Sequence, residues 1–182
     1  MTHEVTLTIP EPLARQAETL IAPDIDSRMK AVIGWSIENV QRGEGPFAAG
    51  IFRLDTGECV GAGVNRVLST GCSVAHAEMM AILMAQKKTG HINLSDEGPM
   101  VITSSAQPCS QCYGGIPWAG LSRLEFGAGR EAVESIGFDE GPCPEDWREQ
   151  LEGRGISVQG PHLSEEALKA LFLYQDQQGT IY

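Results

Sequence analysis

Two short segments of the chain, His76–Glu78 and Pro108–Cys112, bring together one imidazole, one carboxylate and two thiols. A catalytic zinc ion commonly takes three protein ligands and keeps its fourth position for water. His76, Cys109 and Cys112 would fill those three places, which leaves the Glu78 carboxylate free to move protons. The residue types and their spacing therefore predict a hydrolytic centre that holds one Zn²⁺ per chain.

The first segment is typical of the start of a helix. Ser73 is placed to cap a helix whose first turn holds residues 75–78. The body of that helix, residues 79–85, is apolar on every side, so we expect it to be buried.

The second segment predicts another helix start, because Pro108 is well suited to a first helical turn. Cys109 and Cys112 then stand three residues apart and share one face of the helix. A helix N-terminus lowers the pKa of a thiol, so both sulfurs would bind zinc as thiolates. Two helix starts would thus meet at an electrically neutral zinc centre.

Each segment alone has a simpler explanation. A His-Ala-Glu triplet in a buried helix usually has no catalytic role, and a Cys-x-x-Cys pair also occurs in redox sites and structural zinc sites. A structural site needs a fourth protein ligand, and no second Cys-x-x-Cys or His-x-x-x-His pair is formed by the remaining candidates, His3, His91, His162, Cys59, Cys72 and Cys143. The two segments together therefore favour a catalytic zinc ion.

The composition fits one domain over residues 1–182 with a full hydrophobic core. The net charge is −11, and the 13 Lys and Arg residues are scattered. Nucleic-acid binding relies on Lys and Arg that neutralise phosphates, so we expect a neutral small-molecule substrate and no polynucleotide. The start of the chain does not resemble a signal peptide, and no segment approaches the roughly 18 apolar residues of a membrane span. With cysteines expected to be reduced, the sequence indicates a cytoplasmic protein without membrane or nucleic-acid partners.

Apolar segments between turn residues predict five strands, at residues 47–54, 59–66, 100–104, 121–127 and 156–159. Residues 1–23 form an extended lead with a short helix, and further helices are predicted at residues 24–42, 131–135, 145–151 and 164–176. The connection between strands four and five contains helix and is too long for a hairpin, so these strands should be parallel. The predicted fold class is α/β, a three-layer α/β/α sandwich around a mixed five-stranded sheet.

Several further positions carry a resemblance to a known family. They are Pro46–Ala49 on the first strand, Asn65 after the second, and Ser104, Ala106 and Trp118–Gly120 around the second zinc segment. Together with the His-x-Glu and Pro-Cys-x-x-Cys segments, they resemble the cytidine deaminase-like zinc-dependent deaminases. Within this superfamily, Ile136–Pro142, Trp147 and the C-terminal Gly179–Tyr182 resemble bacterial guanine deaminases, a group described as also acting on ammeline. Gln107 departs from the usual Glu of the family, and Ser110-Gln111 replaces a more apolar pair.

The resemblance implies the cytidine deaminase-like fold, in the branch whose fourth and fifth strands are parallel. It also implies a zinc-dependent aminohydrolase that converts a free nucleobase, guanine before others, to xanthine and ammonia. Glu78 would carry protons from water to the ring and to the leaving ammonia. An acid of the Gly-Phe-Asp-Glu-Gly loop would assist from the far side of the base, with Glu140 as the first candidate and Asp139 as the alternative.

Five further residues are candidates for binding the substrate. Asn65 has both a donor and an acceptor for a purine edge, and the N–H of Ala77 at a helix start suits a substrate oxygen. Phe47 is expected either to stack on the base or to pack in the core. Trp118 and Tyr182 are expected to line the pocket.

The resemblance also implies a homodimer in which the C-terminal tail, residues 177–182, closes an active site, either its own or its partner's. Other functions stay open at this point. A cytosine, cytidine or other amino-heterocycle deaminase would share the motifs, and so would a tRNA-adenosine deaminase, although the acidic charge conflicts with tRNA binding. A non-catalytic module stapled by zinc would need a fourth protein ligand.

Overall fold

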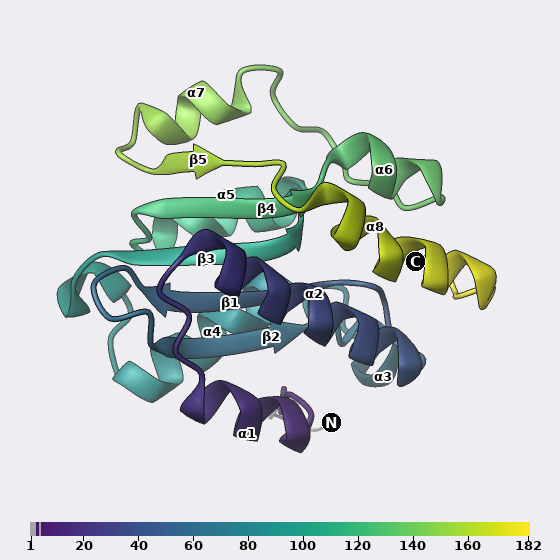
Figure 1. The fold of residues 1–182 in the computed structure, drawn as a ribbon, viewed down its shortest axis with the longest axis horizontal. Helices are drawn as coiled ribbons and strands as arrows, with labels where there is room; N and C mark the ends of the chain where they lie inside the picture. The colour runs from purple at the N-terminus through teal and green to yellow at the C-terminus, as the bar shows by residue number, and fades with distance from the viewer. Residues whose placement is uncertain (1–2, 4) are drawn as a thin grey trace.

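A mixed five-stranded sheet forms the middle layer of the computed structural model, which describes residue 3 and residues 5–182 (Figure 1). The strands lie in the order β2-β1-β3-β4-β5, and their bounds are β1 Ala48–Arg53, β2 Cys59–Val64, β3 Met100–Ala106, β4 Arg123–Ala128 and β5 Ser157–Gln159. Strand β1 is antiparallel to β2 and β3, whereas β3, β4 and β5 run parallel. The predicted mixed sheet with parallel fourth and fifth strands is confirmed.

Helices cover both faces of the sheet (Figure 1). One face packs against α1 (Glu11–Thr19), α2 (Ile25–Gln41) and α8 (Ser164–Asp176), and the other against α4 (Ala77–Thr89) and α5 (Ser110–Trp118). The crossover between β4 and β5 contains α6 (Arg130–Ser135) and α7 (Trp147–Glu152). Alternate residues of β1 enter the two cores, Ala48 and Phe52 the first, Ala49 and Ile51 the second, as the period of a strand requires.

The long helices agree closely with the sequence pattern. Helix α8 has the predicted bounds, and α2 begins after Asp24, whose carboxylate accepts the N–H of Ser27 at 2.8 Å. Two short elements were not predicted, the helical turn α3 (Val67–Thr70) and the 3₁₀ helix η1 (Leu94–Glu97). Within the part of the chain that the structure describes, no helix is both long and apolar enough for a membrane crossing.

Glycines on β2 let α4 approach the sheet closely. A Cβ on Gly63 would lie 2.2 Å from the carbonyl oxygen of Ala77, and one on Gly61 would lie 2.5 Å from the amide nitrogen of Ala85. Only a residue without a Cβ fits at these two positions. The contact holds the first turn of α4, and His76 before it, near the carboxyl end of β2.

Helices α4 and α5, expected to start at the two zinc-binding segments, both begin later than predicted. Ser73 is exposed and does not cap α4; His76 is itself the N-cap, because the N–H of Ala75 is still engaged in a turn with the carbonyl of Cys72. Pro108 precedes α5, whose N-cap is Cys109. The N–H of Gln107 bonds the carbonyl of Ala128 at 2.8 Å, so the chain stays extended up to the residue before the proline.

The expectation that α4 is buried on every side is wrong at one stripe. Met80, Ala81 and Ile82 are buried, but the side chain of Leu83 is 42% exposed and Met79 is half-buried. Met79 lies beside Gly115 of α5, whereas Leu83 is open to solvent.

Candidate active site

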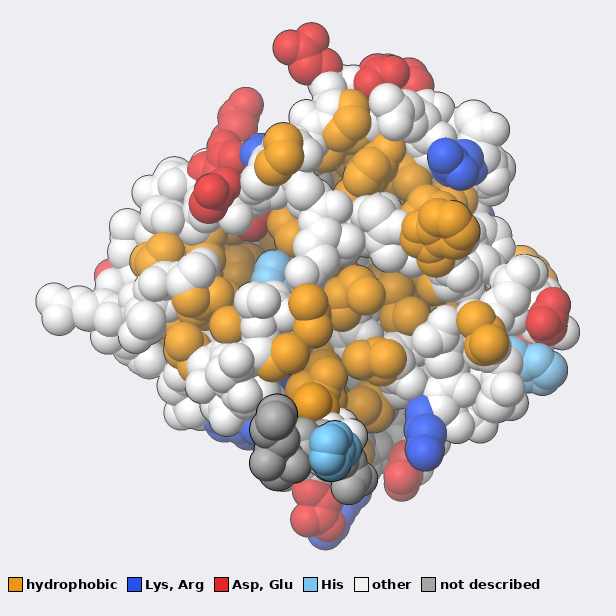
Figure 2. Space-filling model, turned by 180° about the vertical axis from the view of Figure 1, so that it is seen from behind, with side chains coloured by type: hydrophobic (Ala, Val, Ile, Leu, Met, Phe, Trp, Pro, Cys, Tyr) orange, Lys and Arg blue, Asp and Glu red, His pale blue; other side chains and the backbone are white. Residues whose placement is uncertain are grey.

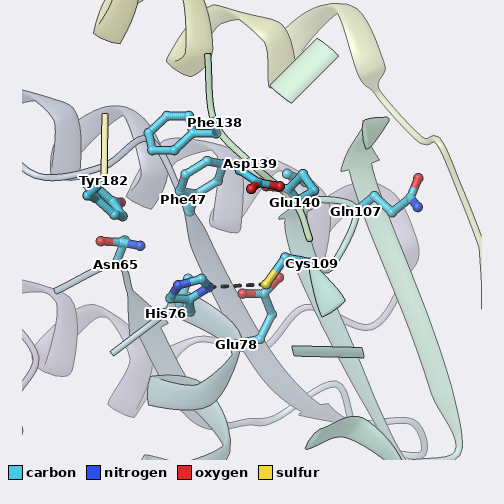
Figure 3. Close-up of a pocket in the computed structure, with 12 residues that line it drawn as sticks. Phe47, Asn65, His76, Glu78, Gln107, Cys109, Phe138, Asp139, Glu140 and Tyr182 are labelled. Carbon is cyan, nitrogen blue, oxygen red and sulfur yellow. Dashed lines mark hydrogen bonds between the residues drawn. The ribbon is translucent and has the colours of Figure 1, made fainter. Parts of the chain in front are cut away.

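The two predicted segments meet in a cavity of about 110 Å³ at one edge of the sheet (Figure 3). Strands β2 and β3 end at this edge and β1 starts there, because β1 is antiparallel to both of its neighbours. The cavity is therefore lined by residues that follow β2 and β3, by the residue before β1, and by the starts of two helices. Its lining is Phe47, Asn65, His76, Ala77, Glu78, Ala106, Gln107, Cys109, Phe138, Asp139, Glu140 and Tyr182.

His76, Cys109 and Cys112 form a cluster that fits a zinc ion. Nδ1 of His76 lies 3.4 Å from Sγ of Cys109 and 3.7 Å from Sγ of Cys112, and the three donor atoms lie within 4.8 Å of one another. Around a tetrahedral Zn²⁺ with Zn–S bonds of about 2.3 Å and Zn–N bonds of about 2.0 Å, sulfur and nitrogen ligands lie about 3.5 Å apart. Among residue 3 and residues 5–182, no other His, Cys, Asp or Glu side chains gather in this way.

The three donor side chains differ in their protonation. A hydrogen bond from Cys112, followed by the interaction with His76, lowers the pKa of the Cys109 thiol to about 4. Burial acts to lower the pKa of His76, but the hydrogen bond with Cys109 and the nearby acidic groups outweigh it and raise that pKa. The Cys109 sulfur is thus held as a thiolate, the form that binds zinc, whereas the hydrogen bond with Cys109, followed by burial, raises the pKa of the Cys112 thiol.

Glu78 lies beside the cluster without being one of its three members. Its side chain is buried, its Oε1 accepts the hydroxyl of Ser104 at 3.0 Å, and its Oε2 lies 3.3 Å from Sγ of Cys112. Burial is the main cause that raises the pKa of Glu78, followed by the charge of Cys109. The carboxyl group is therefore close enough to the cluster to exchange protons with a water molecule there.

The N–H of Ala77 and the side chain of Asn65 are available to a ligand. Ala77 is the first residue of α4, so its N–H has no partner within the helix. Asn65 uses its Oδ1 to accept the N–H of Val67 at 3.1 Å, which leaves the Nδ2 hydrogens for the cavity. The carbonyls of Asn65 and Gly45 are both held by the side-chain amide of the buried Asn39, at 2.9 and 2.8 Å.

Glu140 and Asp139 both line the cavity, but their surroundings differ. Glu140 is 8% exposed, and burial, then the charges of Cys109 and Glu78, raise its pKa to about 8. Asp139 is exposed, and its Oδ1 accepts the N–H of Gly141 at 2.8 Å. Asp139 thus forms a local turn of the loop, whereas Glu140 is buried in the cavity lining and interacts with the charges of Cys109 and Glu78.

Aromatic rings close the cavity on the side away from His76 and Cys109 (Figure 3). Phe138 lies at their centre, with ring centroids 5.0 Å from Phe47, 5.8 Å from Tyr174 and 5.3 Å from Tyr182. The sequence pattern indicates no separate role for Phe138, although this residue stands next to Asp139 and Glu140. Phe47 both lines the cavity and packs against the core.

The C-terminal tail reaches the cavity of its own chain. The Tyr174 hydroxyl donates to the carbonyl of Thr180 at 2.5 Å, and the N–H of Gly179 donates to the carbonyl of Tyr174 at 3.0 Å. A Cβ on Gly45 would meet the Tyr182 hydroxyl, so Tyr182 packs directly on the loop before β1. The tail of this chain therefore lies at the chain's own cavity.

One of the sequence-predicted site residues, Trp118, lies elsewhere in the structure. Trp118 does not line the cavity, because its side chain is 86% exposed near the end of α5; the expectation for this residue is wrong in the single chain. Gln107 lines the cavity, but Figure 3 shows its amide pointing away from the zinc cluster.

Residues 26–128 match the family model of the cytidine and deoxycytidylate deaminase zinc-binding region. The structure is similar to that of the guanine deaminase from Nitrosomonas europaea, with 37% identity and a TM-score of 0.92 over 97% of this chain and 98% of that chain. A crystal structure of a protein in complex with 2,6-diaminopurine is 38% identical, with a TM-score of 0.90 over 98% of this chain and 95% of that chain. The guanine deaminase of Bacillus subtilis is 32% identical over 113 residues, which are 62% of this chain and 69% of that protein.

Proposed function

This chain belongs to the cytidine and deoxycytidylate deaminase zinc-binding family, and on that premise we propose that it hydrolyses guanine to xanthine and ammonia. Deamination is the chemistry of the family, so the chain is a hydrolytic deaminase. The choice of guanine rests on one observation above the others. Two buried carboxyl groups from distant segments, Glu78 and Glu140, line the same small cavity beside the metal-ligand cluster.

Guanine is a demanding substrate, because its C2 carries the amino group between two ring nitrogens. One carboxyl group can take up the proton of the attacking water and pass it to the ring nitrogen on its own side and to the departing ammonia. A second carboxyl group on the opposite side can assist at the other ring nitrogen. Glu78 suits the first role and Glu140 the second. Similarity to the guanine deaminase of Nitrosomonas europaea over 97% of this chain supports this assignment.

The metal would be held by His76, Cys109 and Cys112, one ion per chain. When bound there, zinc would lower the pKa of water to near neutrality and so supply the nucleophile. The protein's part is to place Glu78 against that water, with the Ser104 hydroxyl holding one carboxylate oxygen in place. The overall reaction consumes one water and releases one ammonia for each base.

The remaining cavity residues would orient the base. The Nδ2 hydrogens of Asn65 suit an acceptor of the purine edge, and the N–H of Ala77 suits the carbonyl oxygen of guanine. Phe47 and Tyr182 would cover the ring and exclude water from it. These contacts recognise a free base from several sides, in keeping with a cavity of about 110 Å³.

A substrate panel tests the proposal. The purified protein is incubated with guanine, ammeline, cytosine, cytidine, adenine and guanosine, and the ammonia released is measured. We expect guanine to be turned over fastest. Turnover of cytosine or cytidine with inert guanine would show a deaminase of another specificity, and no release from any of them would favour the zinc-stapled module. X-ray absorption on the zinc-loaded protein distinguishes the two possibilities independently by the number of protein ligands to zinc. A structural zinc site requires four protein ligands, and the proposed enzyme requires three.

We also propose that the protein is a homodimer through the outer face of α4 and α5. Figure 2 shows hydrophobic side chains gathered on the side of the molecule that these helices cover. The exposed apolar side chains there include Leu83 and Trp118, at 42% and 86% exposure. Exposed apolar patches of this kind mark protein interfaces. We expect Trp118→Lys to convert the dimer to monomers in sedimentation velocity runs. The cytoplasmic location stays a prediction.

A further inference from the structure

Ser110 stands between the two metal-binding cysteines and contacts a loop that follows it by 30 residues. Its N–H donates to the carbonyl of Glu140 at 3.0 Å. Its hydroxyl lies 2.6 Å from the carbonyl oxygen of Pro142 and 3.1 Å from that of Glu140. Side chain and backbone of one residue therefore hold the backbone on both sides of Gly141.

The loop from Phe138 to Pro142 has no helix or strand to fix it. Its geometry depends on a few hydrogen bonds. The Asp139 carboxylate accepts the N–H of Gly141, and the Arg130 guanidinium donates to the carbonyl of Gly141. The bonds from Ser110 complete the set. Gly141 adopts a left-handed conformation with φ of 69°, and a Cβ there would lie 3.0 Å from Oγ of Ser110. The hydroxyl thus packs against the bend that follows Glu140.

These contacts join two parts of the site that the chain supplies separately. Helix α5 carries Cys112 and follows Cys109, whereas Glu140 arrives on the loop after α6. A general acid must lie within hydrogen-bonding reach of the atom that it protonates, and misplacement by about 1 Å can cost about 100-fold in rate. A direct link from the metal-binding turn to the Glu140 backbone therefore sets where the second carboxyl group stands relative to the metal.

We propose that the Ser110 hydroxyl is a positioning device for Glu140, tying the turn that binds the metal to the loop that carries the second carboxyl group. The inference rests on the proposed role of Glu140 in the reaction. Ser110 touches neither the substrate nor the metal; it acts through Glu140. The Ser110 N–H bond to Glu140 is independent of the side chain, so removal of the hydroxyl loosens the loop without releasing it.

The first test compares Ser110→Ala with its neighbour Gln111→Ala. Gln111 lies in the same Cys-x-x-Cys turn, is exposed, and makes no side-chain hydrogen bond among the described residues, so it is a matched control. For Ser110→Ala we expect kcat for guanine to fall about 3- to 10-fold, the scale of one hydrogen bond, with a nearly unchanged KM. Zinc content should equal that of the wild type. Ser110→Thr, which keeps the hydroxyl, should restore most of the lost kcat.

The second test is a double-mutant cycle with Glu140→Gln. If Ser110 acts through Glu140, Ser110→Ala should cost less than about 2-fold once Glu140 has lost its acid function. An undiminished loss in that background overturns the inference, and so does loss of zinc in Ser110→Ala or an unchanged kcat. The Glu140→Gln variant alone tests the proposed role of Glu140 independently of Ser110. An unchanged kcat in this variant would refute that role.

Discussion

The hydroxyl of Ser104 donates a hydrogen bond of 3.0 Å to Oε1 of Glu78, and both side chains are buried. Ser104 belongs to β3, the central strand of the sheet, and Glu78 to the first turn of α4. One carboxylate oxygen is therefore tied to the central strand of the sheet. The other, Oε2, faces the sulfur of Cys112 and the metal-ligand cluster.

Glu78→Gln should abolish most of the activity and keep the metal. The amide is nearly isosteric and Glu78 is not a ligand, so zinc content should not change. One general acid–base step contributes about 10²- to 10⁴-fold, and Glu78 serves more than one step, so the loss of kcat should reach the upper end of that range. The exposed Glu152→Gln is the control. A Glu78→Gln enzyme with a tenth of the wild-type turnover would refute the assignment.

His76→Ala, Cys109→Ala and Cys112→Ala should each lose zinc and activity together. Each removes one of three donors that lie within 4.8 Å of one another, and a catalytic site has no spare protein ligand. Metal analysis of the purified variants measures this directly. Cys72→Ala, which changes a cysteine outside the cluster, should retain one zinc per chain. Stoichiometric zinc in Cys112→Ala would remove that residue from the ligand set.

Glu140→Gln should lower kcat for guanine more than Asp139→Asn does. Glu140 is buried in the lining of the cavity, whereas Asp139 is exposed and accepts the N–H of Gly141. We expect about 10²-fold or more for Glu140→Gln, with substrate binding nearly unchanged. Asp139→Asn should cost about 10-fold or less, since an asparagine oxygen can still accept the same bond. The reverse order of the two variants would assign the acid to Asp139.

Removal of residues 179–182 should cut turnover sharply and leave zinc content and thermal stability nearly unchanged. The tail brings Tyr182 to the cavity wall, where it would exclude water during the reaction. Tyr182→Ala should reproduce most of the loss, and Gln177→Ala, an exposed residue before the tail turns back, should not. A truncated enzyme with full activity, or one whose melting temperature falls in step with its activity, would make the tail purely structural.

Glu125→Gln should lower the free energy of unfolding rather than act on the catalytic step. Its carboxylate bonds the Arg28 guanidinium at 2.7 and 2.9 Å and the Thr103 hydroxyl at 2.8 Å, with both members of the ion pair buried. Loss of one partner leaves a buried charge uncompensated, at a cost of about 3–5 kcal/mol in the free energy of unfolding. Urea denaturation measures this. Lys88→Ala, which removes the exposed partner of Glu58, should cost under about 1 kcal/mol.

The sequence alone determined the donor set and the layers of the fold. The spacing of His76, Cys109 and Cys112 made them recognisable as donors. Near a helix start, spacing along the chain determines which side chains share one face of the helix. The parallel pairing of β4 and β5 followed from a connection too long for a hairpin. The bounds of α8 were predicted from the sequence pattern of residues 164–176.

Tertiary structure decided what local pattern could not. Asp139 and Glu140 are adjacent acids in an irregular loop, yet their environments differ. The loop is held by Ser110, which lies on α5 and is distant in sequence, and by Arg130 of α6. Phe138 became the centre of an aromatic cluster because α8 and the tail fold back over it. Trp118 looked like a pocket residue from its place after the zinc segment, yet it points outward. In each case the direction of a side chain depends on packing between segments far apart in the chain, which periodicity along the sequence does not encode.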